Sequence, residues 1–262
     1  MLNISCPDRD AAEDIDSIIS EKYTGIVKTT LQKIKPKIKN RYSDYSKIEL
    51  GQRLTATAFS DDEKNALQHL YGSQTTTAKK IVDSISKVQL QTQAGCCVCC
   101  GIGDADQIDH FLPQEHFPEY SIMHKNLIPI CGTCNEIKGE NIPGDAKNYF
   151  HPMFDRLPNE PFFSCQINYD GNIPISSFTI IPKFQTTIIN QHFIDLKLKG
   201  RLEKKATIYF VQIKDFKSKF GDDFAKEEII RDSIKLGALY GSNYWKCILC
   251  LEMINTNFID NI

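Results

Sequence analysis

The cysteines of this chain gather in one short segment, and this clustering constrains the fold more than any other feature of the sequence. Six of the ten cysteines fall within 39 residues. They are Cys96, Cys97, Cys99, Cys100, Cys131 and Cys134. Free cysteine is often a small buried residue, so a chance run of core residues is the alternative explanation. The arrangement in pairs favours metal ligation in a reducing compartment.

Two Cys-x-x-Cys pairs frame this segment with the spacing of a zinc site. The second pair is Cys131 and Cys134. Two registers are possible for the first pair, Cys96/Cys99 or Cys97/Cys100. We favour the second register because Gly101 follows it directly and permits a tight turn. Four thiolates close a tetrahedral Zn²⁺ site, so the predicted metal is structural and not catalytic.

Size and composition indicate a globular chain outside the membrane. The sequence has 262 residues, 41% of them hydrophobic, which is enough to bury a core without cross-links. No apolar stretch reaches the length that a bilayer span requires. The first twenty residues are acidic and lack the basic start and apolar run of a signal peptide. We therefore expect a cytoplasmic protein that has no membrane partner.

The net charge of −2 conceals a basic segment near the N-terminus. Residues 22–53 contain nine Lys or Arg and two acidic residues, and nine minus two gives a local charge of +7. Such a segment either lies along a phosphate backbone or forms a solvated helix face. The residues that we expect to contact nucleic acid are Lys35, Lys37, Lys39 and Arg41.

Helical patterns precede the cysteine segment. Residues 10–35 carry apolar side chains at helical spacing, and Pro36 is the predicted end of that helix. The Ser-Asp-Asp-Glu sequence at 60–63 is a capping box that predicts the start of a short helix. A further helix is expected around residues 78–90, where four aliphatic side chains share one side.

A hairpin and further helices are expected after the cysteine segment. Residues 162–181 alternate apolar and polar side chains around an Asp-Gly-Asn turn. Helical patterns return near residue 187, and Ser242-Asn243 is the predicted cap of the last helix. The sequence thus predicts an α+β protein in three parts. These are a helical region 1–94, a central module 95–155 and a C-terminal hairpin with helices 156–262.

A second motif set lies in and after the stretch between the cysteine pairs. Its residues in chain order are Asp109, His110, Asn126, Asn135 and Lys138. The order Asp-His, Asn-Leu and Cys-x-x-Cys-Asn-x-x-Lys resembles the HNH endonucleases, which have the ββα-metal (His-Me finger) fold. The resemblance covers about residues 95–155 and implies a zinc-bound ββα module between helical parts. Asn135 stands where some members of the family have His.

The resemblance implies a role for each motif residue. A neutral His110 suits a general base near pH 7, because its unperturbed pKa lies close to that pH. Mg²⁺ or Mn²⁺ prefers oxygen ligands, which Asp109 and Asn135 supply. Asn126 would brace the loop before the second strand and help to orient His110. Lys138, one helical turn past Asn135, either meets a phosphate or is a solvated helix residue.

The expected function is hydrolysis of phosphodiester bonds in DNA by an HNH endonuclease. The resemblance further implies a bacterial anti-phage or restriction-type effector that a regulatory ATPase or sensor protein gates. The alternatives are a zinc-stabilised nucleic-acid-binding module without catalysis and an RNA-cutting, toxin-like nuclease. Asp109, His110 and Asn135 favour hydrolysis, because a purely structural zinc module needs none of them. Nothing in the sequence reports a contact with a 2′-hydroxyl.

Other histidines and cysteines have expected places outside the site. His116 and His124 are expected at the surface, in the loop between the predicted strands. His151 either places a second imidazole near the phosphate or belongs to a structural turn, which we favour. Cys247 and Cys250 lie in an apolar helical run and are expected in the core.

Overall fold

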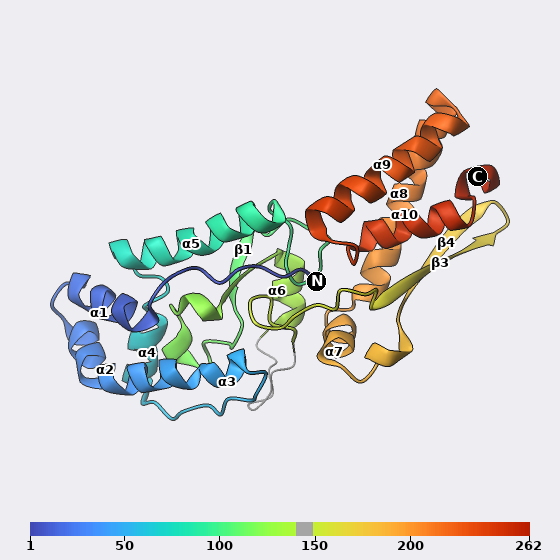
Figure 1. Cartoon of the computed structure of the whole chain (residues 1–262). Helices are drawn as coiled ribbons and strands as arrows, with labels where there is room; N and C mark the ends of the chain where they lie inside the picture. Colours follow the sequence, from blue (N-terminus) through green and yellow to red (C-terminus); the bar gives the residue numbers. More distant parts are fainter. Residues whose placement is uncertain (140–148) are drawn as a thin grey trace. The chain divides into compact units, whose positions relative to one another are not determined.

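The computed structural model describes residues 1–139 and 149–262, and the chain divides into two compact units. The N-terminal unit comprises residues 3–99 and 103–156. The C-terminal unit comprises residues 1–2, 100–102 and 157–262. Figure 1 shows helices together with short strands, and the described strands form two antiparallel pairs. The expected α+β class is thus confirmed at the level of mixed helices and small sheets.

Five helices precede the central strands in the N-terminal unit. They are α1 (Ala11–Glu21), α2 (Ile26–Asp44), α3 (Ser46–Glu49), α4 (Asp61–Gln68) and α5 (Thr76–Gln93). Helix α5 runs along one side of this unit and α2 along the other, with the central strands between them (Figure 1). Helix α4 begins at Ser60 with the predicted capping box: the Ser60 side chain accepts from Glu63 N, and the Glu63 side chain accepts from Ser60 N.

The prediction of one helix ending at Pro36 is wrong. The chain leaves the helix after Glu21, starts α2 at Ile26 and continues helically through Pro36 to Asp44. Proline removes one backbone hydrogen bond and crowds the preceding turn. Burial of an apolar stripe on both sides of the proline outweighs this cost, because tertiary packing supplies most of a helix's stability. The buried residues are Leu31, Ile34, Ile38 and Tyr42.

Two short strands and a helix follow the first cysteine pair. Strand β1 (Gln107–His110) pairs antiparallel with β2 (Leu127–Ile130), and α6 (Gly132–Lys138) follows. The connection contains the 3-10 turns η1 (Pro118–Tyr120) and η2 (His124–Asn126). Helix α5 packs on β2, while α2 and α4 pack on η1. Strand β2 is buried along its whole length, so it fixes β1 and α6 to the helical core.

The C-terminal unit is built on the predicted hairpin. Strands β3 (Phe163–Asp170) and β4 (Ile173–Ile180) pair in register across a two-residue turn. Gly171 has a φ of +58° there, a left-handed conformation that glycine adopts at little cost. The remaining elements are η3 (Pro182–Phe184), α7 (Ile188–Asp195), α8 (Leu198–Phe220), α9 (Asp222–Tyr240), α10 (Trp245–Asn255) and η4 (Phe258–Asn261).

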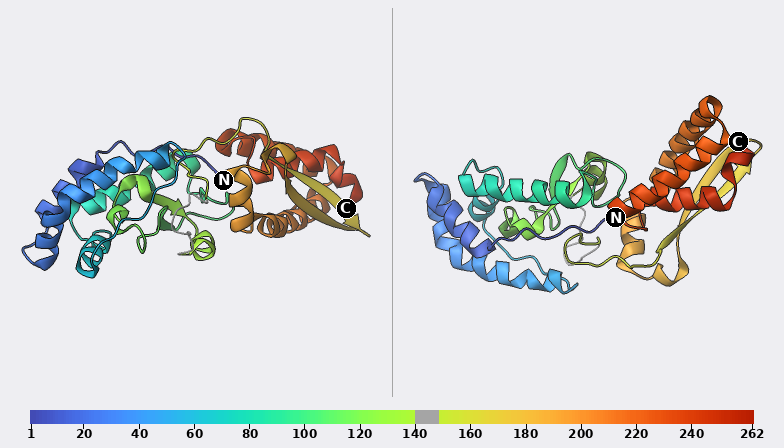
Figure 2. Two further views of the ribbon diagram at one scale, coloured as in Figure 1. Left: turned by 90° about the horizontal axis from the view of Figure 1, so that it is seen from below. Right: turned by 45° about the horizontal axis from the view of Figure 1, so that its top comes forward.

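The helices of this unit cover the hairpin. Helix α8 packs on β4 and α10 on β3, while α9 lies against α10 and α8 (Figures 1 and 2). The predicted cap of α10 is wrong: Tyr244 is the N-cap, and Asn243 binds elsewhere. Its Oδ1 accepts from Phe162 N at 3.3 Å, and its Nδ2 donates to Pro158 O and Glu160 O. Among the described residues, no helix is long and apolar enough to cross a membrane.

Candidate functional site

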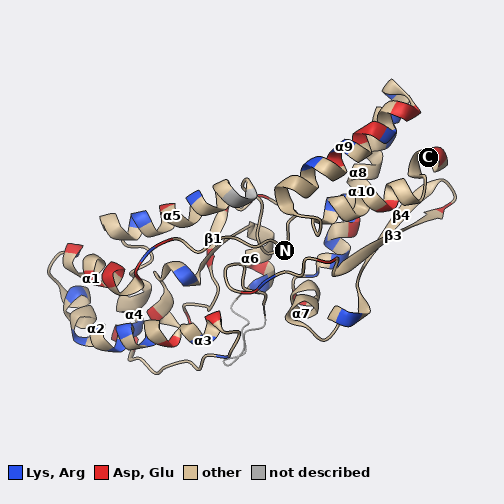
Figure 3. Ribbon diagram, viewed as in Figure 1, with Lys and Arg blue, Asp and Glu red and all other residues tan. Residues whose placement is uncertain are grey.

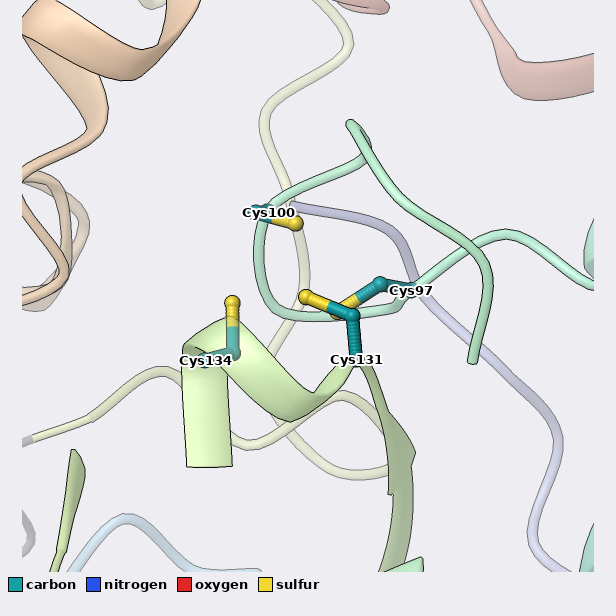
Figure 4. A group of neighbouring side chains, drawn as sticks. All are labelled: Cys97, Cys100, Cys131 and Cys134. Atoms are coloured by element: carbon teal, nitrogen blue, oxygen red, sulfur yellow. The ribbon is translucent and has the colours of Figure 1, made fainter. Parts of the chain in front are cut away.

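Four buried cysteines form a cluster with the ligand set of a zinc site. The Sγ atoms of Cys97, Cys100, Cys131 and Cys134 all lie within 4.8 Å of one another. Figure 4 shows their side chains turned toward a common space. In a tetrahedral site with Zn–S bonds near 2.3 Å, the sulfur atoms are about 3.8 Å apart. The cluster can therefore hold a metal ion such as zinc.

The local backbone explains which register the first pair adopts. Cys97 N donates to Gly103 O at 2.7 Å, which closes a turn, and Gly101 takes the left-handed conformation with a φ of +64°. Ile102 N donates to the sulfur of Cys100 at 3.4 Å, a contact typical of a Cys-x-x-Cys turn. Cys96 instead forms a β-bridge with Asp104. The structure therefore selects Cys97 and Cys100 and leaves Cys96 outside the cluster.

Helix α6 presents the other two cysteines and two motif residues. Cys131 is the N-cap of α6 and Cys134 lies in its first turn, so both point toward the first pair. Asn135 and Lys138 follow on the same short helix, which ends at Gly139. The cluster thereby fixes the start of the helix that carries these two residues.

Lys138 is buried and bound to strand β1. Its Nζ lies 2.6 Å from Asp109 Oδ2 and donates a second 2.6 Å hydrogen bond to His110 O. The side chain is only 3% exposed. Lys138 is therefore no solvated residue, and any direct contact with a phosphate would require this ion pair to open. The pair engages one carboxylate oxygen of Asp109 and leaves Oδ1 for another ligand.

His110 has a fixed ring orientation and a defined tautomer. Its Nε2 lies 2.8 Å from Ser121 O. A carbonyl oxygen only accepts hydrogen bonds, so Nε2 carries the proton and Nδ1 carries the lone pair. The ring of Tyr71 lies edge-on to the imidazole with centroids 4.6 Å apart, and the Tyr71 hydroxyl donates to Ile108 O at 3.1 Å. Burial lowers the pKa of His110, which keeps the imidazole neutral near pH 7.

Asn126 clamps the connection between the two strands. The side chain is fully buried and uses both of its polar atoms. Its Oδ1 accepts from Leu112 N at 2.8 Å and from the Tyr45 hydroxyl at 3.1 Å. Its Nδ2 donates to Leu112 O at 3.0 Å and to Tyr120 O at 3.3 Å. This places Asn126 as a brace of the loop that follows His110, and its hydrogen bonds go to this loop and to Tyr45.

One open pocket gathers three of the four predicted catalytic residues, and Asn126 is not part of its lining. Asp109, His110, Asn135 and Lys138 all line a depression of about 290 Å³. Asn135 Nδ2 donates to Gln107 Oε1 at 2.7 Å, so the amide oxygen remains for another partner. Together with Asp109 Oδ1 it offers the hard oxygen donors that Mg²⁺ and Mn²⁺ prefer. The donor chemistry of the pocket therefore fits a divalent cation.

The basic residues of α2 have partners within the N-terminal unit. Asp16 pairs with Lys35 at 3.2 Å and with Lys39 at 2.6 Å. Lys37 Nζ donates to Ala58 O at 2.7 Å and lies 3.8 Å from the centroid of the Phe59 ring. In Figure 3 the charged positions of α1 are acidic, and those of α2 are basic except at its C-terminal end. The ion pairs with Asp16 neutralise part of the positive charge of α2. This part of the charge is therefore less available to a phosphate backbone than the sequence alone indicates.

Arg41 is the most constrained of these cations. Its Nε donates to Glu119 Oε1 at 2.7 Å, and its two terminal nitrogens donate to Asp44 and to Thr55 O. Glu119 is fully buried, so Arg41 is the counter-ion of a buried carboxylate. Removal of Arg41 would leave that charge unpaired, which is costly in a protein interior. A structural role accounts for this arginine without any nucleic acid.

The other histidines lie away from the pocket lining. His116 is exposed as expected, whereas His124 is buried and both of its ring nitrogens lack hydrogen-bond partners in the described structure. Burial lowers the pKa of His124 to about 4. His151 is buried between Phe111 and Phe154, and its Nδ1 accepts from Met153 N at 3.2 Å. This contact is the structural turn that the sequence favoured.

Sequence reasoning missed the residues that orient the motif. Tyr71 contacts the His110 ring, Gln107 binds Asn135, and the carbonyl of Ser121 accepts from His110. Gln107 directly precedes the Ile-Asp-His string, so its position on the same strand was an available signal. No sequence signal marked Tyr71 or Ser121, because their contacts depend on how α4 and the 111–126 connection pack.

Comparison with known proteins identifies one partial relative. Protein ea31 of Escherichia phage lambda is 35% identical over 96 residues, which is 36% of this chain and 32% of that protein. The chain thus matches about a third of the length of this relative, whose name states no activity. No family model matches the sequence. No solved structure matches the chain.

Proposed function

We propose that this chain is a metal-dependent nuclease of the HNH type. The observation that carries the proposal is a single open pocket lined by an imidazole, a carboxylate and an amide. The strand–strand–helix order of β1, β2 and α6 agrees with the ββα arrangement that the motif implies. The cysteine cluster anchors α6, so its proposed role is structural zinc binding.

In the proposed mechanism His110 is the general base. The hydrogen bond to Ser121 O holds the ring with Nδ1 unprotonated, and Nδ1 accepts a proton from the water that attacks the phosphate. Tyr71 limits rotation of the ring from one side. The lowered pKa favours the neutral imidazole, which is the form that a base requires.

Asp109 and Asn135 are the proposed ligands of Mg²⁺ or Mn²⁺. When bound, such an ion stabilises negative charge on the scissile phosphate and on the leaving oxygen. Lys138 acts in this proposal as a positioning residue, because it holds Asp109 and the His110 carbonyl to α6. This role replaces the phosphate contact that the spacing on the helix had suggested.

DNA is the proposed substrate, and a gating partner is part of the proposal. Both rest on the resemblance to HNH endonucleases, in which anti-phage and restriction-type effectors act on DNA under control of an ATPase or sensor. An ungated DNase would damage its host. Strong cleavage of unmodified host DNA by the isolated protein would contradict gating.

Two other functions compete with this proposal. A zinc-stabilised nucleic-acid-binding module would bind without hydrolysis, and an RNA-cutting nuclease would use the same pocket on a different backbone. Supercoiled plasmid, linear duplex and single-stranded RNA should each be incubated with the purified protein in Mg²⁺, Mn²⁺ or EDTA. We expect slow nicking of plasmid by excess protein with either cation, as a gated enzyme without its partner would show, and none in EDTA. Cleavage of RNA alone would favour the second alternative, and binding without cleavage would favour the first.

A further inference from the structure

Helix α9 exposes large apolar side chains along its outer face. Ile230 and Ile234 lie one turn apart and are 44% and 69% exposed. The opposite face of the helix is buried through Ala225 and Ile229. The two exposed isoleucines therefore point away from the core of their own unit. Together with Glu227, Arg231 and Lys235 they line an open groove of about 360 Å³ along the helix.

Charges of opposite sign stand at the two ends of this groove. Glu227 precedes Ile230 by one turn, and Lys235 directly follows Ile234. Within the described part of the chain, neither Glu227 nor Lys235 has an ion-pair partner. Three other pairs involve charged residues of the helix: Lys226 with Asp260, Arg231 with Glu228 and Asp232 with Lys246. The groove thus keeps one acidic and one basic side chain available.

We propose that α9 packs antiparallel against α9 of a second copy of this chain. A two-fold axis near Asp232 sets Ile230 of each copy opposite Ile234 of the other. Glu227 then lies within about two residues, or about 3 Å of helix rise, of the level of Lys235 in the other copy. A lysine side chain spans that offset easily.

The second copy is the occupant that the charges favour. A helix that packs antiparallel to α9 in this groove needs two apolar residues four positions apart. It also needs an acidic residue on their N-terminal side and a basic residue on their C-terminal side. Helix α9 itself carries this pattern. The same surface on both partners is the usual arrangement in two-fold dimers. This inference stands apart from the proposed nuclease activity.

Sedimentation velocity of the zinc-loaded, 262-residue chain from about 1 to 100 μM tests the proposal. We expect a reversible monomer–dimer equilibrium. Ile234→Glu should weaken association about 100-fold, because it replaces an apolar contact on each side of the two-fold axis with a carboxylate that loses hydration on association. Val211→Glu is the matched control, since Val211 is a 65% exposed apolar residue on α8. This control should leave association unchanged, and circular dichroism verifies that both variants fold.

Charge reversal tests the pairing itself. Glu227→Lys and Lys235→Glu should each weaken association about tenfold. The double variant should restore it, and an equimolar mixture of the two single variants should associate as well as the wild type. A wild type that stays monomeric throughout the range would assign the groove to a different partner and overturn the proposal. Unchanged association of Ile234→Glu, or failure of the double reversal to restore it, would overturn it equally.

Discussion

Lys138→Met tests whether the buried ion pair organises the candidate site. Methionine keeps the unbranched apolar stem but removes the ammonium group that contacts Asp109 and the His110 carbonyl, both at 2.6 Å. Breaking a buried pair by removing one partner costs about 3–5 kcal/mol, because a charge is left without compensation. Asp109 is 14% exposed and regains some hydration, so we expect the lower end, about 3 kcal/mol.

Urea unfolding of the zinc-loaded protein, followed by circular dichroism, measures this change. The matched control is Lys87→Met, an exposed lysine on α5, which should alter the free energy of unfolding by less than about 0.5 kcal/mol. Asp109→Leu combined with Lys138→Met should recover part of the loss, because neither charge then remains buried. The reasoning is refuted if Lys138→Met is no more destabilising than Lys87→Met.

Three further predictions concern the cysteine cluster, a buried histidine and the loop clamp. Cys134→Ser should abolish binding of one zinc per chain and unfold the N-terminal unit, whereas Cys99→Ser should retain the metal; metal analysis and circular dichroism separate the two. His124 binds protons in the unfolded chain below pH 6.5 but in the native chain only near pH 4. Stability should therefore fall by about 3 kcal/mol as the pH drops through this window, and His124→Gln, unlike His116→Gln, should remove that slope in pH-dependent urea titrations. Asn126→Ala forfeits four side-chain hydrogen bonds and should cost roughly 3 kcal/mol in thermal or urea unfolding, with retention of wild-type stability as the contrary result.

Local patterns in the sequence predicted the features that depend on neighbouring residues. The capping box at Ser60 depends on contacts between residues three positions apart, and the hairpin around Gly171 depends on its turn and the alternating residues on either side. Both are present in the structure. The paired cysteines predicted the four-cysteine cluster, because their spacing alone defines two adjacent thiols on each turn. The register that Gly101 favoured, Cys97 with Cys100, is the one present in this cluster, and Gly101 takes the left-handed conformation there.

Features that depend on distant residues were not predictable from local patterns. Pro36 lies inside α2 because a buried stripe continues past it. Asn243 caps no helix because its side-chain oxygen accepts a hydrogen bond from Phe162 N, 81 positions away. The basic segment pairs with Asp16 and Glu119, which lie 23 and 78 residues from Lys39 and Arg41. Long-range partners of this kind determine whether a charge faces solvent, and only the folded chain reveals them.

The central claim is that His110 acts as the general base of a phosphodiester hydrolase, and single-turnover nicking of supercoiled plasmid in Mg²⁺ tests it most directly. His110→Ala should be compared with the wild type and with His116→Ala, an exposed histidine in the same connection. Zinc content and circular dichroism should first establish that all three proteins are folded. We expect the nicking rate to fall about 100- to 10,000-fold for His110→Ala and to stay at the wild-type level for His116→Ala. Equal nicking by His110→Ala and the wild type, or no nicking by the wild type with either Mg²⁺ or Mn²⁺, would contradict it.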